Sequence, residues 1–262
     1  MSESTSGAVR LETGGAVATV VLDRAGKLNA LTPDMIEELA QIAQRLDSDA
    51  QIRCVILTGA GDKAFCVGAD INAWAALDPL DMWRRWVRRG HQVFDLWAQL
   101  RVPVIAAING HALGGGLELA AVADIRIAVD SANFGLPEAS IATCPGWSGT
   151  QRLAALIGTS QVKYLALTGT RIDAAEARRI GILHEQVKGK DVLARAHELA
   201  SGICKLAPVS VQLTKQIIDA GRGEGLAGAL ESMAGALAAT TADAREGVTS
   251  FREKRPPVYG GN

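Results

Sequence analysis

The chain has 262 residues, enough for one large domain or for a domain of about 200 residues with a smaller appendage. Its 27 Lys and Arg residues nearly balance its 28 Asp and Glu residues, which leaves a net charge of −1. This balance lacks the basic excess typical of nucleic-acid-binding proteins. We therefore expect no nucleic-acid partner, and we expect any charge on a substrate to be met by a few local side chains.

The chain begins with a polar segment, MSESTSGAVR, that lacks the apolar region of a secretory signal. No later segment reaches the ~18 uninterrupted apolar residues of a membrane span. We therefore expect a cytoplasmic protein without a membrane partner. The 4 Cys and 4 His residues are scattered, with no Cys-x-x-Cys pair, which predicts free thiols in a reducing compartment and no metal site.

Short segments rich in β-branched residues predict buried strands, and helical patterns lie between them. The clearest helix covers residues 32–46, where Thr32 suits the N-cap and Pro33 suits the first helical position. This alternation of strands and helices predicts an α/β fold. The predicted strands cover residues 16–22, 54–58, 103–108 and 124–129.

The strand pattern fades from about Ala174 onward, and helical patterns dominate the rest of the chain. The last two of these helices have small, Ala-rich faces that suit close packing. We expect an α/β body over residues 1–200 and a helical C-terminal unit over residues 201–262. The predicted helices cover residues 191–205, 209–220, 226–240 and 243–253.

The stretch NGHALGGGLEL, residues 109–119, places a run of glycines between a predicted strand and a helix, with Glu118 in the first helical turn. A phosphate cradle is one interpretation, but the stretch lacks the Walker residues and the G-x-G-x-x-G spacing, and Glu118 would repel a phosphate. Close packing of the helix on the sheet is a second. In a third, the glycines expose an N–H group to a carbonyl that becomes an oxyanion, beside a carboxylate that moves a proton.

The oxyanion interpretation requires a second N–H donor and a second acid, and the sequence offers a candidate for each. The segment AFCVGADI, residues 64–71, follows a predicted strand, so its N–H groups would open near the sheet edge where α/β proteins bind ligands. Glu138, in FGLPEA, follows a proline in an apolar loop that would raise the pKa of its carboxyl group. A Pro-Glu pair in a loop is also typical of a solvated turn.

Taken together, the motifs AFCVGADI, PVIAAINGHALGGGLELAAVADIRIA, FGLPEA and PGWSGTQRL resemble those of the enoyl-CoA hydratase and isomerase family, also called the crotonase family. LNAL, LTG and EGVTSFREKRPP extend the match over nearly the whole chain. The resemblance implies a β-β-α spiral core, a C-terminal helical trimerisation unit, and a homotrimer or a homohexamer built from two trimers. It also implies an acyl-CoA thioester substrate and no separate cofactor, because coenzyme A is part of the substrate.

The resemblance also implies roles for individual residues. It assigns the oxyanion-hole N–H donors to Val67 and Gly115, and the two acids of the family's hydratases to Glu118 and Glu138. In syn hydration of a trans-2-enoyl-CoA, Glu118 would activate the water for attack at Cβ while Glu138 handles the proton at Cα. Many relatives that isomerise or hydrolyse thioesters retain one of these acids or neither, so the pair favours a hydratase over a Δ3,Δ2-enoyl-CoA isomerase. Two carboxylates around one water should titrate together, with one pKa raised.

Further positions follow from the same resemblance. Gly146 matches a residue whose N–H helps to hold the water. Trp147 and Ser148 depart from the family pattern, which has two small residues here, so Trp147 either narrows the acyl pocket or packs in the core. Lys254 or Arg255 is a candidate contact for a CoA phosphate, or a solvated charge. The segment that resembles the family's adenine-contacting backbone consists of Ala69, Asp70 and Ile71.

The segment MWRRWVRRGH, residues 82–91, interleaves aromatic residues and arginines, as some RNA-binding surfaces do. Its arginines recur four residues apart, so an amphipathic helix with a cationic face explains them equally well. In relatives this region borders the acyl pocket. A non-catalytic CoA-binding or RNA-binding scaffold is the alternative from another class, and loss of an acid would be its usual sign.

Overall fold

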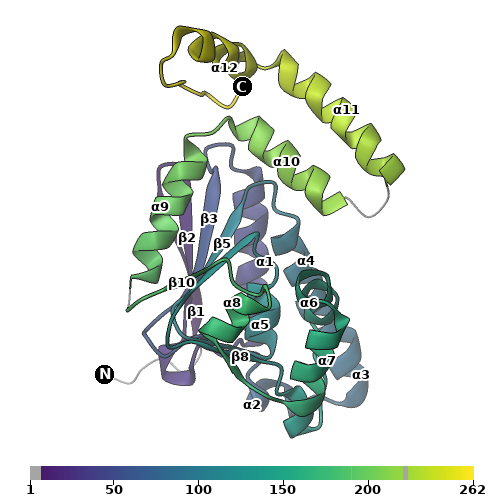
Figure 1. Ribbon diagram of the computed structural model, residues 1–262. Helices are drawn as coiled ribbons and strands as arrows, with labels where there is room; N and C mark the ends of the chain where they lie inside the picture. The colour runs from purple at the N-terminus through teal and green to yellow at the C-terminus, as the bar shows by residue number, and fades with distance from the viewer. Residues whose placement is uncertain (1–6, 190, 221–223) are drawn as a thin grey trace.

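The computed structural model describes residues 7–189, 191–220 and 224–262; the start of the polar N-terminal segment lies outside them. A six-stranded sheet forms the centre of the molecule, with the strand order β1-β2-β3-β5-β7-β10 (Figure 1). β1 is antiparallel to β2, and the other neighbouring strands are parallel. The strands are β1 (Ala8–Gly14), β2 (Val17–Asp23), β3 (Cys54–Gly59), β5 (Val104–Ile108), β7 (Ile125–Val129) and β10 (Glu185–Val187).

A second sheet of four short strands has the order β4-β6-β8-β9. In chain order, β3, β5 and β7 of the large sheet are each followed by one strand of the small sheet and then by a short helix. The predicted β-β-α spiral is therefore confirmed. Each of its turns ends where a helix begins, which is where backbone N–H groups become free. The small strands are β4 (Ala64–Cys66), β6 (His111–Leu113), β8 (Asn133–Gly135) and β9 (Ile172–Asp173), and the short helices are α2 (Ile71–Trp74), α5 (Gly115–Ala120) and η3 (Glu138–Ile141).

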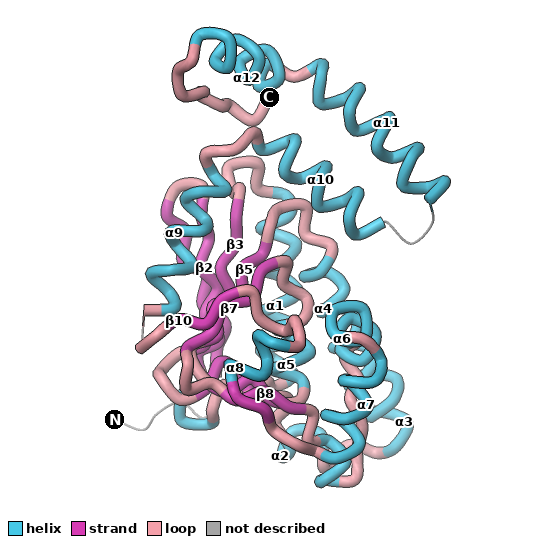
Figure 2. Tube along the Cα trace, viewed as in Figure 1, coloured by secondary structure: helices cyan, strands magenta, loops and turns pink. Residues whose placement is uncertain are grey.

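Helices cover both faces of the large sheet. Helix α1 (Pro33–Ser48) begins as predicted, because Thr32 Oγ1 accepts a hydrogen bond from Met35 N (3.2 Å). Figures 1 and 2 show α1 and α4 (Arg88–Ala98) on one side of the sheet and α9 (Val192–Cys204) on the other. The buried strands therefore lie between two helical layers. The remaining helices of this part are η1 (Ala25–Lys27), α3 (Pro79–Asp81), the π-helix η2 (Met82–Val87), α6 (Gly149–Ile157), α7 (Thr159–Thr168) and α8 (Ala174–Arg179).

All four predicted strands are present, displaced by no more than one residue at either end. The expectation that strands end near Ala174 was wrong for β10, which pairs with β7. Its three residues, Glu-Gln-Val, are half-buried and too few to show an alternating pattern. No helix among the described residues is long and apolar enough to cross a membrane. The predicted C-terminal helices are present as α9, α10 (Pro208–Ala220), α11 (Glu224–Thr240) and α12 (Ala242–Glu253).

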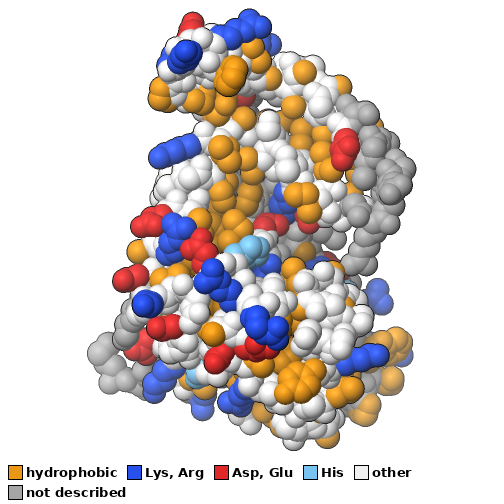
Figure 3. Space-filling model, viewed as in Figure 1, with side chains coloured by type: hydrophobic (Ala, Val, Ile, Leu, Met, Phe, Trp, Pro, Cys, Tyr) orange, Lys and Arg blue, Asp and Glu red, His pale blue; other side chains and the backbone are white. Residues whose placement is uncertain are grey.

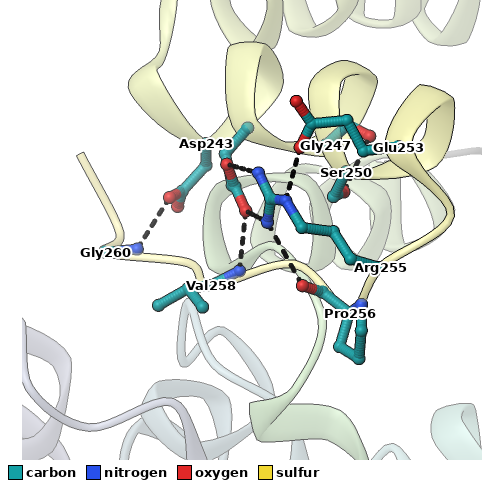
Figure 4. Close-up of polar contacts among 9 residues, drawn as sticks. Asp243, Gly247, Ser250, Glu253, Arg255, Pro256, Val258 and Gly260 are labelled. Atoms are coloured by element: carbon teal, nitrogen blue, oxygen red, sulfur yellow. Dashed lines mark hydrogen bonds and ion pairs between the residues drawn. The ribbon is translucent and has the colours of Figure 1, made fainter.

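After α12 the chain folds back along the helix (Figure 4). The carboxylate of Asp243, in the first turn of α12, accepts hydrogen bonds from the backbone N–H groups of Gly260 (2.7 Å) and Gly261 (2.8 Å). Arg255 forms ion pairs with Glu246 and Glu253, each at 2.6 Å. The guanidinium proposed above as a contact for a CoA phosphate is therefore engaged inside the C-terminal unit.

Candidate active site

A cavity of about 540 Å³ lies where the turns of the spiral end. Its wall brings together five predicted site residues from three separate segments: Val67, Gly115, Glu118, Glu138 and Gly146. It also brings in Ala69 and Ile71, whereas Asp70 is used elsewhere. The Asp70 carboxylate pairs with Arg24 at 2.7 Å and accepts a hydrogen bond from Asn72 N at the start of α2.

Glu118 is anchored by backbone groups. Its side chain is on α5 and only 2% of the residue is exposed. Oε1 accepts hydrogen bonds from Trp147 N (3.0 Å) and Gly149 N (2.8 Å). Burial raises the pKa of Glu118, while the N–H groups of Gly149, Trp147 and Gly146 act against that rise because they stabilise the carboxylate. These contacts fix Oε1 and leave Oε2 available to a ligand.

Glu138 is buried differently. It begins η3 directly after Pro137, and neither carboxyl oxygen has a hydrogen-bond partner among the residues that the structure describes. Burial raises the pKa of Glu138 to about 7, and the nearby charge of Glu118 acts in the same direction. An unpaired buried carboxylate is costly, so at neutral pH this group readily holds a proton.

The N–H group of Gly115 opens into the cavity. Gly115 is the first residue of α5, so its N–H has no acceptor one turn earlier in the helix. A Cβ at Gly68, where φ is +99°, would lie 3.0 Å from Gly115 N and would cover this donor. The second predicted donor, Val67 N, donates to the carbonyl oxygen of Leu28 at 3.2 Å, near the long end of the hydrogen-bond range. A ligand oxygen at this position would share the Val67 N–H with Leu28.

The arginine-rich segment runs along η2 into α4. Trp86 and Val87 line the cavity. Two of the arginines are paired with carboxylates: Arg85 with Asp81 (3.3 Å) and Arg89 with Glu37 (2.6 Å). The segment therefore borders the cavity with its apolar side chains and directs these two arginines away from it.

The sequence did not identify the residues that hold Glu118. Gly149 is essential to this arrangement, because a Cβ there would lie 2.1 Å from Cγ of Glu118. Ser148, just before it, has φ of 65°, a left-handed conformation that is uncommon for serine and places both flanking N–H groups on the carboxylate. The only signal in the sequence was the second glycine of PGWSG, Gly149, which by itself indicates no particular contact.

Comparison with known proteins identifies the family of this chain. Residues 12–262 match the model of the enoyl-CoA hydratase/isomerase family. The chain belongs to this family. Among its relatives are the short-chain-enoyl-CoA hydratase of Clostridium acetobutylicum, 41% identical over 94% of this chain and 95% of that one, and the crotonyl-CoA hydratase of Syntrophomonas wolfei, 37% identical over the same shares.

Solved structures of the enoyl-CoA hydratase/isomerase family share the fold. An enoyl-CoA hydratase from Bacillus anthracis is 38% identical and superposes with a TM-score of 0.93, over 97% of this chain and 99% of that one. An enoyl-CoA hydratase from Geobacillus kaustophilus is 29% identical, with a TM-score of 0.94 over 100% and 98% of the two chains. The expected crotonase-like core and C-terminal helical extension are thus confirmed for this chain.

Proposed function

We propose that the protein is an enoyl-CoA hydratase, which adds water to a trans-2-enoyl-CoA thioester and gives a 3-hydroxyacyl-CoA. The observation that carries this proposal is the pair of buried carboxyl groups, Glu118 and Glu138, in the wall of one cavity beside the N–H of Gly115. Glu118 is anchored by the N–H groups of Trp147 and Gly149, whereas neither carboxyl oxygen of Glu138 has a hydrogen-bond partner among the described residues. Such a pair suits a reaction in which one group accepts a proton while the other donates one.

The thioester carbonyl is bound by backbone N–H groups. Its oxygen accepts hydrogen bonds from Gly115 N and from Val67 N, which it shares with Leu28. As negative charge develops on this oxygen, each donor contributes roughly 3 kcal/mol to stabilisation of the transition state. Charge on the oxygen is what allows water to attack Cβ, because the electrons of the double bond move toward the carbonyl.

The two acids then divide the proton transfers. Oε2 of Glu118 accepts a proton from the water as its oxygen forms the bond to Cβ. Glu138, whose pKa is raised to about 7, holds a proton and delivers it to Cα. The net result is H and OH added to the double bond. Glu118 then releases the proton that it took from the water and Glu138 regains one, through solvent or a second water, which restores the starting state.

Coenzyme A is part of the substrate, and we propose no separate cofactor or metal. The backbone of residues 69–71 is the proposed contact for the adenine. Gly146 directs its N–H at the same carboxylate as Trp147 and Gly149, which supports its proposed role beside the water. Nucleic acid is not a proposed partner, because the arginine-rich segment forms ion pairs and lines the cavity.

We further propose that residues 1–200 form the catalytic core and residues 201–262 an oligomerisation unit, in a homotrimer or homohexamer. Hydrophobic side chains gather on the visible face of the C-terminal helices (Figure 3). These side chains have little to pack against within one chain. Light scattering should give a trimer or hexamer, and a stable monomer at micromolar concentration would contradict the proposal. The exposed residues are Ile218, Met233, Leu237, Val248, Phe251 and Val258.

The function is tested with two substrates. Wild-type protein should remove the conjugated enoyl absorbance of crotonyl-CoA by hydration, and should do so faster than it converts a 3-enoyl-CoA into the conjugated isomer. Preference for the 3-enoyl substrate, together with full activity of Glu118→Gln, would replace the hydratase by a Δ3,Δ2-enoyl-CoA isomerase that works with one acid. No turnover of either substrate, with acyl-CoA still bound, would indicate a non-catalytic scaffold.

A further inference from the structure

The indole ring of Trp147 forms part of the cavity wall beside the catalytic groups. A Cβ placed on Gly115 would lie 2.9 Å from ring atoms Cε3 and Cζ3. The backbone N–H of the same tryptophan donates to Glu118. Cβ of the substrate must come within reach of Glu118. The acyl chain beyond Cβ therefore meets Trp147, whose backbone N–H anchors that carboxylate.

The ring has no room to swing aside. Trp147 is 3% exposed. The centroid of its ring lies 5.3 Å from that of Trp86, with an angle of 58° between the ring planes. It lies 5.2 Å from the centroid of Phe94, in an edge-to-face arrangement. Close-packed aromatic contacts of this kind hold a side chain in one rotamer. The wall behind the reacting carbons is therefore rigid.

Helix α4 is shaped to receive the ring. Gly90 lies inside this helix, where glycine is disfavoured. A Cβ at Gly90 would lie 2.1 Å from Nε1 of Trp147, closer than any real contact. Steric contact with the indole thus explains why glycine occupies position 90, and Gly90 and Trp147 are complementary in shape.

We propose that Trp147, seated by Gly90, closes the inner end of the acyl site and restricts the protein to short acyl chains. Chains that extend well beyond Cβ would have to displace a ring packed between two other aromatic side chains. This inference rests on the proposed function only in taking an acyl-CoA thioester as the ligand. Recognition by a rigid wall is steep, because one methylene in a hydrophobic pocket changes kcat/KM by roughly 10- to 200-fold.

The first experiment measures hydration of crotonyl-CoA and of its six-, eight- and ten-carbon homologues. For the wild type, kcat/KM should fall by at least about tenfold over this series. In Trp147→Ala the ratio of ten-carbon to four-carbon activity should rise by at least about tenfold, and in Trp147→Phe by less. A wild-type profile that is flat, or one that Trp147→Ala leaves unchanged, would overturn the inference.

A matched control variant and a second substitution that restores activity show whether the effects come from the acyl site or from a general disturbance of the fold. Trp97 lies on α4, the helix that contains Gly90, and is fully buried. Its ring N–H donates to the carbonyl oxygen of Leu39, and the residue lies outside the cavity wall. Trp97→Phe should leave the chain-length profile unchanged. Gly90→Ala should displace the indole and lower crotonyl-CoA activity, and adding Trp147→Ala should restore it, because the clash is then removed. If Gly90→Ala has wild-type activity, Gly90 does not seat the ring.

Binding provides a readout that is independent of turnover. Saturated butyryl-CoA and decanoyl-CoA cannot be hydrated, and calorimetry gives their affinities directly. Wild type should prefer butyryl-CoA, and Trp147→Phe and Trp147→Ala should progressively lose that preference. If this occurs while no enoyl-CoA is hydrated, the proposed function fails and the inference stands. If wild type hydrates crotonyl-CoA but binds both saturated thioesters equally, the function stands and the inference fails.

Discussion

The two carboxyl groups of the site are chemically identical but have opposite surroundings. Glu118 lies on a helix, and two backbone N–H groups fix one of its oxygens. Glu138 lies at the start of a 3-10 turn, and neither of its oxygens is bonded to a described residue. Burial raises the pKa of both; at Glu118 the N–H groups of three other residues oppose the rise, whereas at Glu138 only its own backbone N–H does so.

The difference shows how a protein assigns two roles to one residue type. Backbone donors favour the carboxylate and hold it in place, which suits a base that must meet a water in one orientation. Burial without donors favours the protonated form and leaves the group free to turn toward the carbon that it protonates.

The largest effect is expected when either acid loses the ability to transfer a proton. Glu118→Gln keeps an oxygen for the two N–H donors, and Glu138→Gln resembles the protonated acid, so both variants should fold, as circular dichroism can verify. Each should lose about 100- to 10,000-fold in hydration of crotonyl-CoA. The double variant should lose far less than the product, because the two act on one transition state. Multiplicative losses would mean that the acids act independently.

The next effect comes from displacing the anchored acid without removing it. In Gly149→Ala the new Cβ would overlap Cγ of Glu118, so the carboxylate must move. A displacement of about 1 Å can cost roughly 100-fold in rate, and we expect a loss of that size in kcat/KM. Gly202→Ala in α9 is the control, because its Cβ would meet no described atom within 4 Å apart from its chain neighbours and the nearby backbone of its own helix. Equal activity of the two variants would show that the anchor is not needed.

The pH dependence of turnover should report the unanchored acid. Because Glu138 must carry a proton, kcat/KM should fall about tenfold per pH unit above a pKa of about 7. In Glu118→Gln the residual activity should begin to fall at lower pH, because burial still raises the pKa of Glu138 but the smaller contribution from the charge of Glu118 is gone. An alkaline limb that does not move would show that the two carboxyl groups are not coupled.

The smallest effect concerns stability. The pKa of Glu138 is raised from 4.5 to about 7, so the folded state holds the proton more tightly and stability falls as pH rises through this window. The full shift corresponds to about 3 kcal/mol, and partial burial reduces the expected cost to about 1 to 2 kcal/mol above pH 7. Urea unfolding should therefore show Glu138→Gln gaining stability over wild type at pH 8 and little at pH 4.5. A gain that does not depend on pH would rule out ionisation as its cause.

The sequence predicted the fold where patterns are local and long. The helix at residues 32–46 carried its own cap and apolar face, and the buried strands were short, mostly apolar segments rich in β-branched residues. Elements of two or three residues, such as β9 and β10, were missed because their stability comes from the neighbours they pair with. The π-helical turn η2 was likewise invisible, since its residues also fit an ordinary amphipathic helix.

The candidate site divides in the same way. Motifs identified Gly115, Glu118 and Glu138, which the structure brings to one cavity. The bond between Gly149 and Glu118 joins residues 31 positions apart, and no local pattern records it. The hydrogen bond of Val67 to Leu28 joins residues far apart in the sequence, and Leu28 has a left-handed backbone conformation that its residue type does not predict. Such contacts are properties of the assembled chain.

The steric conflict between a side chain at position 90 and the indole at position 147 also constrains the order in which these two positions can be substituted. While the residue at 147 is small, position 90 is free to vary. Once tryptophan stands at 147, any residue except glycine at 90 puts a Cβ against the indole nitrogen. Glycine must therefore come first on any path whose intermediates all keep the site intact, and reversal must begin at 147. A single substitution can remove the indole, whereas restoring it after position 90 has drifted takes two substitutions in a fixed order.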